Sequence, residues 1–276
     1  MKGGAHGVTE TGQNDAAKPA TAARIYDYIL GGTHNFPADR AAAQMLIQAT
    51  PTIPAIARST RAFLRRAVGY LADQGVRQFL DVGSGIPTAG HVHQVAESVP
   101  DARVVYVDID PVAVAESLEL LEGNDRATAL RADLREPEAI LEHPETRRVI
   151  DFSQPIGLLM VSMLHFVDDS AYPAVQRLLA ATPAGSYLAI SHGTVPEEED
   201  LPPGDVDEAR EIYRASTATP LLTRDRAAIT RFFDGLELVE PGLVWAPLWR
   251  PGPGDPDDFA TNPVASGFLV GVGRKP

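Results

Sequence analysis

The sequence predicts an α/β protein built on a doubly wound, mostly parallel sheet of seven strands, with an antiparallel C-terminal strand pair and an N-terminal helical cap. Apolar, strand-like runs alternate with helical stretches through the middle of the chain. This alternation is typical of βαβ units, in which a helix connects two parallel strands. The strand-like runs are 78–82, 103–107, 127–132, 156–163 and 186–191, and the helical stretches between them are 88–99, 111–121, 136–148 and 171–182.

The first part of the chain predicts a tail followed by helices. Residues 1–20 are small and polar without periodicity, so we expect a disordered tail. We expect residues 21–75 to form the helical cap and residues 76–276 to form the main domain. Helical patterning begins near Ala22 and ends at Gly31-Gly32, which is a common stop signal for a helix.

Two further helices complete the predicted cap. Asn35 is the expected N-cap of the helix FPADRAAAQMLIQAT, because short polar side chains satisfy the free N–H groups of a first turn. The third helix follows Pro54 and ends at Gly75. Its apolar residues recur at helical spacing and predict one buried face: Phe63, Leu64, Ala67, Val68 and Leu71.

The C-terminal part breaks the βαβ alternation. The runs 236–246 and 266–273 are joined by a proline-rich connection that cannot form a crossover helix. We therefore expect them to form an antiparallel pair at one end of the sheet. The acidic segment 196–208 is either a solvated loop or a lid over a site.

Composition excludes several classes of function. The chain has 276 residues, no cysteine and a formal net charge of −13. Disulfides and cysteine-based zinc sites are therefore excluded, and no histidine and carboxylate cluster has metal-ligand spacing. An acidic chain is a poor binder of nucleic acid, whose phosphates need clustered basic residues. The longest apolar run, 156–167, is too short for a membrane span, and the N-terminus lacks a secretory signal, so we expect a cytoplasmic protein.

A glycine-rich turn follows the first predicted strand. In Phe79-Leu80-Asp81-Val82-Gly83-Ser84-Gly85, the glycines allow a tight turn and a close approach of backbone to a ligand. The next helix would offer free N–H groups to a polar ligand. A dinucleotide fingerprint has a third glycine where Thr88 stands, which disfavours nicotinamide binding. The alternative is that the glycines serve only a tight strand-to-helix turn.

Acidic residues follow the second and third predicted strands. Asp108 is the first polar residue after the run 103–107, where an acid accepts hydrogen bonds from ribose hydroxyls in doubly wound folds. Asp110 precedes Pro111 and is expected to be a helix N-cap. Asp133 follows the third strand, either as an acceptor for an adenine amino group or as a turn or capping residue.

This pattern resembles a class I S-adenosylmethionine-dependent methyltransferase with a Rossmann-like fold. The glycine turn, Asp108, Asp133 and a fourth strand ending in Met163-Leu164-His165-Phe166 carry the resemblance. Segments 24–40, 58–96 and 151–167 more narrowly resemble a largely actinobacterial methyltransferase family formerly filed as a domain of unknown function. The departures from that family are Thr33-His34, Pro37 and His91.

The resemblance implies a set of cofactor-binding residues with S-adenosylmethionine as the cofactor. These are Gly83, Gly85, Asp108, Ile109, Asp133 and Leu134, with the N-terminal helices covering the pocket. The cationic sulfonium is favoured by aromatic faces, for which Tyr26, Tyr28 and Phe36 are available. The alternative for Tyr28 and Phe36 is core packing of at least one of them.

Arginines and histidines are the other candidates. The methionine carboxylate needs an arginine fork, which we assign to Arg61 in preference to Arg58; the alternative is that both are solvated. His165 and His192 end the fourth and fifth strands on the ligand side of the sheet. Either is a candidate catalytic base, and the alternative is a structural role. His93 is expected to be a polar-face or capping residue.

We therefore expect a methyltransferase acting on an oxygen or nitrogen of a small-molecule acceptor, with no nucleic acid, membrane or metal partner. Methyl transfer is an in-line displacement that needs alignment and exclusion of water rather than a dedicated nucleophile. The first alternative is a non-catalytic protein that binds S-adenosylmethionine or a partner. The second is an NAD-dependent Rossmann enzyme, which the residue Thr88 disfavours.

Overall fold

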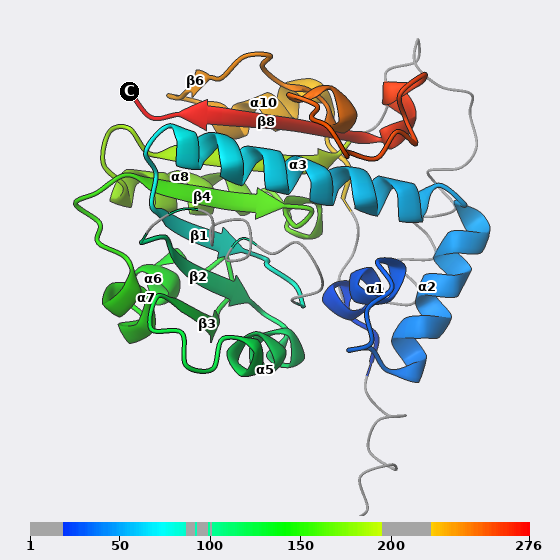
Figure 1. Ribbon diagram of the computed structural model, residues 1–276, viewed down its shortest axis with the longest axis horizontal. Coiled ribbons are helices and arrows are strands. Elements are labelled where there is room, and N and C mark those ends of the chain that lie inside the picture. The colour runs from blue at the N-terminus through cyan, green and yellow to red at the C-terminus, as the bar shows by residue number, and fades with distance from the viewer. Residues whose placement is uncertain (1–18, 87–91, 93–98, 100, 195–221) are drawn as a thin grey trace, which may run out of the picture.

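The computed structural model describes residues 19–86, 92, 99, 101–194 and 222–276. One sheet occupies the centre of the molecule, with helices on both faces (Figure 1). Several predicted features lie outside the described residues. They are residues 1–18 of the predicted tail, most of the predicted helix 88–99, the acidic segment 196–208, and the residues Thr88, His91 and His93.

The sheet has the predicted parallel core and antiparallel end. The parallel strands are β1 (Gln78–Val82), β2 (Arg103–Asp108), β3 (Ala127–Arg131), β4 (Ile156–Val161) and β5 (Tyr187–Gly193). The order is β3-β2-β1-β4-β5-β8-β6, and β8 (Phe268–Arg274) runs antiparallel to β5. The predicted fold class is confirmed.

The predicted strand 236–246 is divided in the structure. It forms β6 (Glu237–Leu238) and β7 (Val244–Trp245), which both pair antiparallel with β8 and give the sheet eight strands. Between them Pro241 has no N–H to donate to a ladder, and Gly242 has a φ of +87°. The chain therefore turns in the middle of this apolar run.

The described helices other than α10 lie where the sequence predicts them, with two corrections, and α10 was not predicted. They are α1 (Ala22–Ile29), α2 (Pro37–Ala49), α3 (Ile53–Asp73), α5 (Pro111–Leu120), α6 (Pro137–Leu141), α7 (Pro144–Val149), α8 (Ala171–Ala181) and α10 (Arg226–Thr230). The predicted helix 136–148 is two helices, because Pro144 cannot continue a helix and instead begins α7.

The second correction concerns Asn35, which is not the N-cap of α2. The N-cap position belongs to Phe36, whose N–H donates to the Asp39 carboxylate at 2.8 Å. The Asn35 amide instead donates to Asp27 at 2.8 Å and to the Gly32 carbonyl at 3.0 Å. Asp39, at the third position of the helix, accepts from the N-cap N–H, as the acidic residue of a capping box does.

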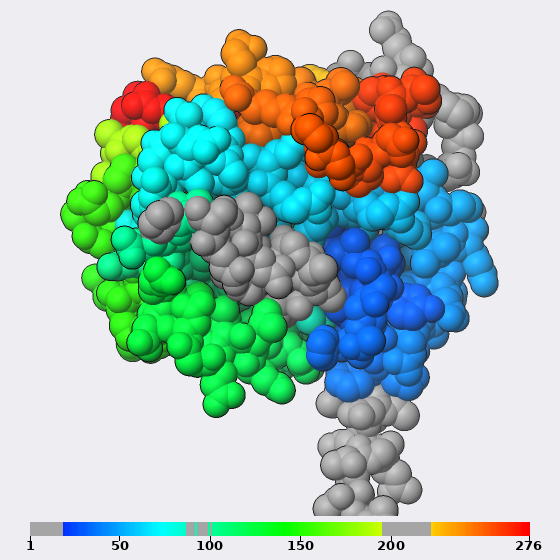
Figure 2. All heavy atoms as spheres, in the orientation of Figure 1, coloured from blue at the N-terminus to red at the C-terminus, as the bar shows by residue number. Residues whose placement is uncertain are grey.

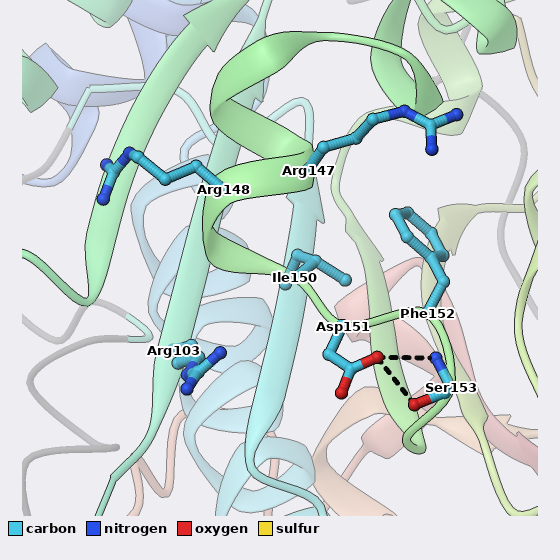
Figure 3. A pocket seen from close by; sticks show the side chains of 7 residues that line it. All are labelled: Arg103, Arg147, Arg148, Ile150, Asp151, Phe152 and Ser153. Atoms are coloured by element: carbon cyan, nitrogen blue, oxygen red, sulfur yellow. Dashed lines mark hydrogen bonds between the residues drawn. The ribbon is translucent and has the colours of Figure 1, made fainter.

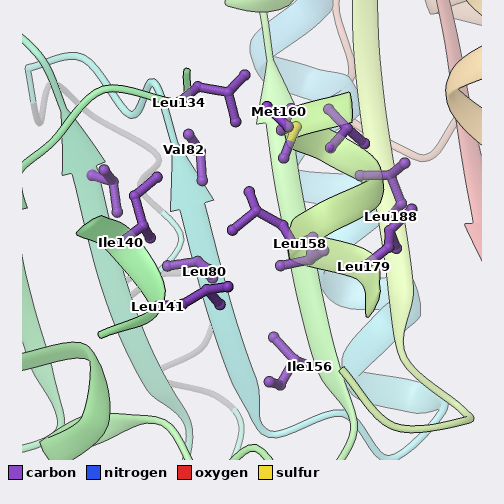
Figure 4. Packing of buried hydrophobic residues seen from close by; sticks show 14 of the residues in the cluster. Leu80, Val82, Leu134, Ile140, Leu141, Ile156, Leu158, Met160, Leu179 and Leu188 are labelled. Carbon is purple, nitrogen blue, oxygen red and sulfur yellow. The ribbon is translucent and has the colours of Figure 1, made fainter. Parts of the chain in front are cut away.

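The sheet is buried on both faces by apolar side chains. On one face, residues of neighbouring strands such as Leu80, Leu158 and Leu188 point toward α8, where Leu179 lies (Figure 4). On the other face, Phe79 packs with Phe63 of α3. Phe79 and Leu80 are adjacent in β1 and point to opposite faces, as successive strand residues do. Helix α3, which the sequence groups with the cap, therefore packs across the sheet.

Helices α1 and α2 pack against each other and contact α3. Their apolar residues, with Ala20 just before α1, make a third cluster, the cap cluster: Ala20, Ile25, Ala42, Ala43 and Leu46. We call α1 and α2 together the α1–α2 cap. The arrowheads of β1, β2 and β4 point toward the side of the molecule where this cap lies (Figure 1). The cap therefore lies at the edge where ligands bind in open α/β sheets.

Candidate functional site

The glycine turn after β1 is fastened to the end of β2. The N–H groups of Gly83 and Ser84 both donate to the Val107 carbonyl, at 2.7 and 3.1 Å. Gly83 and Gly85 have φ values of +71° and +66°, which other residues rarely adopt. A Cβ at Gly83 would lie 2.5 Å from the Cβ of Met163, so this position also lacks room for any side chain.

Asp108 lies at the end of β2 beside this turn. One carboxylate oxygen accepts from the Gly85 N–H at 2.8 Å, and the other accepts from the Asp110 N–H at 2.8 Å. Burial raises the pKa of Asp108 to about 6, although hydrogen bonds from the backbone act in the opposite direction. Asp110 caps α5 by accepting from the Val112 N–H at 2.9 Å, which confirms the expected N-cap.

Two buried ionisable residues, Asp81 and Arg61, lie close to this turn. Asp81 of β1 is fully buried, and burial raises its pKa to about 7 while the Arg61 cation lowers it. Arg61 of α3 is only 8% exposed, and its Nε is buried without a hydrogen-bond partner among the described residues. Its Cζ lies 5.5 Å from the centre of the Tyr26 ring. The site therefore contains a buried guanidinium, a buried carboxyl and an aromatic face.

Asp81 is the residue of this group that sequence reasoning missed. A signal was present, because Asp81 is the single charged residue of β1 (QFLDV) and is flanked by the apolar residues Leu80 and Val82. A carboxyl group inside a fully buried strand needs a compensating partner, and such groups cluster at functional sites.

The other predicted arginine and the predicted aromatic residues lie in different surroundings. Arg58 is half exposed and pairs with Asp258 at 2.6 Å. The Tyr28 ring packs against the cap cluster, and its hydroxyl accepts from Gln44 at 3.2 Å. Phe36 lies under the Arg24 guanidinium, whose Cζ is 5.0 Å from the ring centre. Tyr26 instead contacts α3, and its hydroxyl donates to the Ala57 carbonyl at 3.1 Å.

The residues after β2 and β3 differ in exposure. Ile109 follows Asp108 and is 53% exposed, which is unusual for an isoleucine next to a buried strand. Leu134 is buried in the apolar cluster on the α8 side of the sheet. Asp133 accepts from the N–H of Arg135 at 2.9 Å and pairs with the Arg135 guanidinium. This pairing lowers the pKa of Asp133.

His165 and His192 lie together at the ends of β4 and β5. Their ring centres are 5.7 Å apart, and His165 also packs edge-on against Phe268. The Nδ1 of His165 is buried without a hydrogen-bond partner in the described part of the chain. Burial, His192 and Arg224 together hold the pKa of His165 well below its ordinary value, so the ring is neutral near pH 7.

Arg224 determines the tautomer of His192. A guanidinium only donates, so the His192 Nε2, 2.9 Å from the Arg224 Nη1, accepts. The proton is therefore on Nδ1, which donates to the Gly193 carbonyl at 2.7 Å. Burial lowers the pKa of His192 to about 4. Both ring nitrogens of His192 are engaged, whereas His165 retains one that is not.

A shallow cavity of about 380 Å³ lies at the opposite edge of the sheet (Figure 3). It is lined by Arg103, Arg147, Arg148, Ile150, Asp151, Phe152 and Ser153. Arg103 begins β2, whereas the glycine turn and Asp108 follow the carboxyl ends of strands. None of the residues predicted for the site lines this cavity.

Two classes of site have no counterpart in the described part of the chain. Across residues 19–86, 101–194 and 222–276, no group of three or more histidines and carboxylates could hold a metal ion. In the same ranges, no helix combines the length and the apolar character that crossing a membrane requires.

The fold, the glycine turn and the acid at the end of β2 define the class of S-adenosylmethionine-dependent methyltransferases. The chain matches the S-adenosyl methyltransferase family over residues 9–276 and belongs to it. The family assigns S-adenosylmethionine as the cofactor, in place of a nicotinamide dinucleotide.

Two crystal structures of bacterial proteins resemble this chain along nearly its full length. A proposed methyltransferase from Thermobifida fusca YX is 41% identical, with a TM-score of 0.85, over 95% of this chain and 96% of that one. A DUF574 family protein from Streptomyces avermitilis MA-4680 is 40% identical, with a TM-score of 0.86, over 94% of this chain and 98% of that one. Among curated proteins, none matches this chain.

Proposed function

We propose that this protein transfers a methyl group from S-adenosylmethionine to an oxygen or nitrogen of a small molecule. The observation that carries the proposal is the arrangement of Asp108. Each of its oxygens accepts one backbone N–H, whereas a carboxylate has about four lone-pair sites. Each oxygen therefore retains capacity for a ribose hydroxyl, and the pKa of about 6 leaves most of the group ionised near pH 7.

The amino-acid end of the cofactor fits the buried pair close to the turn. Its carboxylate matches Arg61, whose Nε has no partner among the described residues, and its ammonium matches Asp81. The backbone of Gly83 and Gly85 would lie close to this end, because neither position carries a side chain. The environment supports Arg61 in preference to Arg58, which Asp258 already engages.

Apolar and aromatic groups are assigned to the rest of the cofactor. The exposed face of Ile109 is suited to the adenine ring, and Leu134 supports the loop from within the core. Asp133 would accept from the adenine amino group, in competition with Arg135. Tyr26, which is next to Arg61, is the aromatic residue best placed for the sulfonium, whereas the packing of Tyr28 supports a structural role. Phe36, under Arg24, remains a proposed covering residue.

When bound, S-adenosylmethionine supplies a methyl group already activated for transfer. The protein's contribution is to align the acceptor and to exclude water. We assign His165 to the acceptor, because its ring is neutral and its Nδ1 has no hydrogen-bond partner among the described residues. His192 is assigned a positioning role, since both of its nitrogens are engaged.

A small acceptor is favoured over a polyanion by the charge of the chain. A formal charge of −13 repels phosphate-rich acceptors such as RNA. Small molecules do not require the basic surface that such acceptors need.

Calorimetric titration with S-adenosylmethionine, S-adenosylhomocysteine and NADH tests the proposal. We expect micromolar binding of the first two, on the order of −8 kcal/mol, and none of the third. Asp108→Ala should abolish binding, while Asp257→Ala, which removes an exposed carboxylate, should not. Tight NADH binding, or no binding of either adenosyl ligand, would overturn the proposal. Binding without turnover on a broad panel of metabolites would instead favour the non-catalytic alternative.

A further inference from the structure

A buried charged network joins the α1–α2 cap to the first turn of α5. It contains Arg24 of α1, Asp39 of α2 and Asp110 at the N-cap of α5, which are 3%, 0% and 5% exposed. The Arg24 Nε lies 3.3 Å from an Asp39 oxygen and 3.6 Å from an Asp110 oxygen. One guanidinium therefore compensates two buried carboxylates from two different parts of the fold.

Thr21 binds the same two carboxylates. Its hydroxyl donates to Asp110 and accepts from the Arg24 Nε at 3.0 Å. Its N–H donates to Asp39 at 3.1 Å. The beginning of α1 is thus held to α5 by groups 89 positions apart in the sequence.

Asp110 connects this network to Asp108. The Asp110 N–H donates to an Asp108 oxygen at 2.8 Å, which is one of the two backbone contacts that hold that carboxylate. A displacement of Asp110 would therefore remove a donor from Asp108. Arg24 is thus connected to Asp108 through one residue, Asp110.

Polar contacts dominate the attachment of the cap to α5. The cap cluster forms a separate apolar group from the two clusters that cover the sheet. A second polar contact links the cap to α5, with the His34 Nε2 3.1 Å from a Glu116 oxygen. In the space-filling view, α1 and α2 form one body at the side of the molecule (Figure 2).

We infer that Arg24 is a positioning residue for cofactor binding. Through Asp110 it holds Asp108 in the geometry that receives the ribose, and it ties the α1–α2 cap to that end of the cofactor. Without the guanidinium, Asp39 and Asp110 would be two uncompensated buried carboxylates next to a third, Asp108. This inference rests on the proposed role of Asp108.

The test compares Arg24→Met with the milder variants Arg24→Lys and Thr21→Val. We expect S-adenosylhomocysteine, measured by calorimetry on folded protein, to bind Arg24→Met at least about tenfold more weakly than the wild type. Arg24→Lys should recover part of this loss, because it restores the charge without the fork. Thr21→Val removes only the hydroxyl and should weaken binding about threefold.

Arg40→Met is the matched control. Arg40 also lies in the cap, but it donates to the Asn35 carbonyl and amide oxygens rather than to α5. Its variant should bind S-adenosylhomocysteine within about twofold of the wild type, since no contact to Asp110 changes. Hydrogen exchange of the Asp110 and Val112 amides should accelerate in Arg24→Met and not in Arg40→Met.

The outcomes separate the inference from the proposed function. If the three variants at Arg24 and Thr21 fold and bind S-adenosylhomocysteine as the wild type does, Arg24 has only a structural role and the inference is wrong. If Arg40→Met loses as much affinity as Arg24→Met, the effect belongs to cap stability in general and the inference is also wrong. A wild-type protein that binds no S-adenosylhomocysteine would overturn the proposed function, and the inference with it.

Discussion

The parallel sheet and the α1–α2 cap are held in the molecule by different kinds of contact. The sheet is covered on both faces by large apolar clusters that include α3 and α8. The cap has a small apolar cluster of its own and joins α5 through buried charges such as Arg24 and Asp110. Apolar packing is non-directional, whereas a buried charge needs its partners in hydrogen-bonding geometry, and loss of one partner leaves the other charge uncompensated. The region nearest the proposed cofactor site is therefore the one whose geometry depends on individual charged groups.

The largest expected effect comes from truncating equivalent leucines in the two regions. Leu80→Ala in β1 should lower the free energy of unfolding by about 3–5 kcal/mol and accelerate hydrogen exchange throughout the sheet. Leu46→Ala in α2 should lower it by about 2–3 kcal/mol and accelerate exchange mainly in α1 and α2. Urea denaturation and hydrogen exchange measure both. If Leu46→Ala accelerates hydrogen exchange in the sheet as much as Leu80→Ala does, the cap and the sheet unfold as one unit.

Gly83 tests whether the glycine turn depends on space as well as on backbone conformation. Gly83→Ala should destabilise the protein by about 3 kcal/mol, because the new Cβ would overlap Met163 and φ is positive. Gly123→Ala is the control, since Gly123 has a φ of +80° with open space around it. That variant should lose only about 1 kcal/mol. If Gly83→Ala and Gly123→Ala lose similar amounts of stability in thermal denaturation, the contact with Met163 relaxes in the Gly83 variant.

The protonation of Asp81 should make ligand binding at the site depend on pH. With a pKa of about 7, the group is about half protonated at pH 7 in the free protein. A bound ammonium group would favour the carboxylate and lower this pKa, so binding of S-adenosylhomocysteine should release about half a proton at pH 7. Calorimetry in buffers of different ionisation enthalpy measures this release. Asp81→Asn should abolish it, whereas Asp257→Asn should retain it.

The raised pKa of Asp81 also determines the direction in which the free energy of unfolding changes with pH. A carboxyl whose pKa is raised on folding binds more protons in the native state than in the unfolded state. The contribution of Asp81 to stability is therefore present at low pH and declines as the pH rises from about 4 to about 7. Asp81→Asn should flatten this part of the curve of stability against pH.

The smallest effect is expected at the exposed contact of the cap. His34→Ala removes the polar contact with Glu116, in which both side chains are partly solvated. The free energy of unfolding should change by no more than about 0.5 kcal/mol, and the affinity for S-adenosylhomocysteine by less than about twofold. Denaturation and calorimetry measure these changes. A loss comparable to that of Arg24→Met would mean that the two cap contacts act together.

Periodicity predicted the sheet because burial on both faces leaves a continuous apolar run in each strand. The five parallel strands and the antiparallel end follow from such runs and their spacing. Interruptions by single residues were harder to predict. Pro144 divides one predicted helix, and the turn at Pro241-Gly242 divides one predicted strand.

The site was predictable only where a residue has a fixed place in a motif. Gly83, Gly85 and Asp108 lie together as the motif implies, and Asp110 has its expected capping role. The contact of Arg24 with Asp110 has no sequence signature, because its members are far apart and no periodic pattern connects them. The assignment of Asn35 as an N-cap was wrong because its side chain binds Asp27 and Gly32, and α2 begins one residue later, with Phe36 as its N-cap.

The position of β8 has a consequence for the order in which the chain acquires its structure during synthesis. Strands β6 and β7 pair with β8, which also covers the edge of β5. The five parallel strands emerge from the ribosome earlier, so the edge of β5 remains uncovered until residues 268–274 have been made. An uncovered edge strand can pair with other chains. A nascent chain stalled before Phe268 would therefore expose a row of free backbone groups along β5 and leave β6 and β7 without their partner strand.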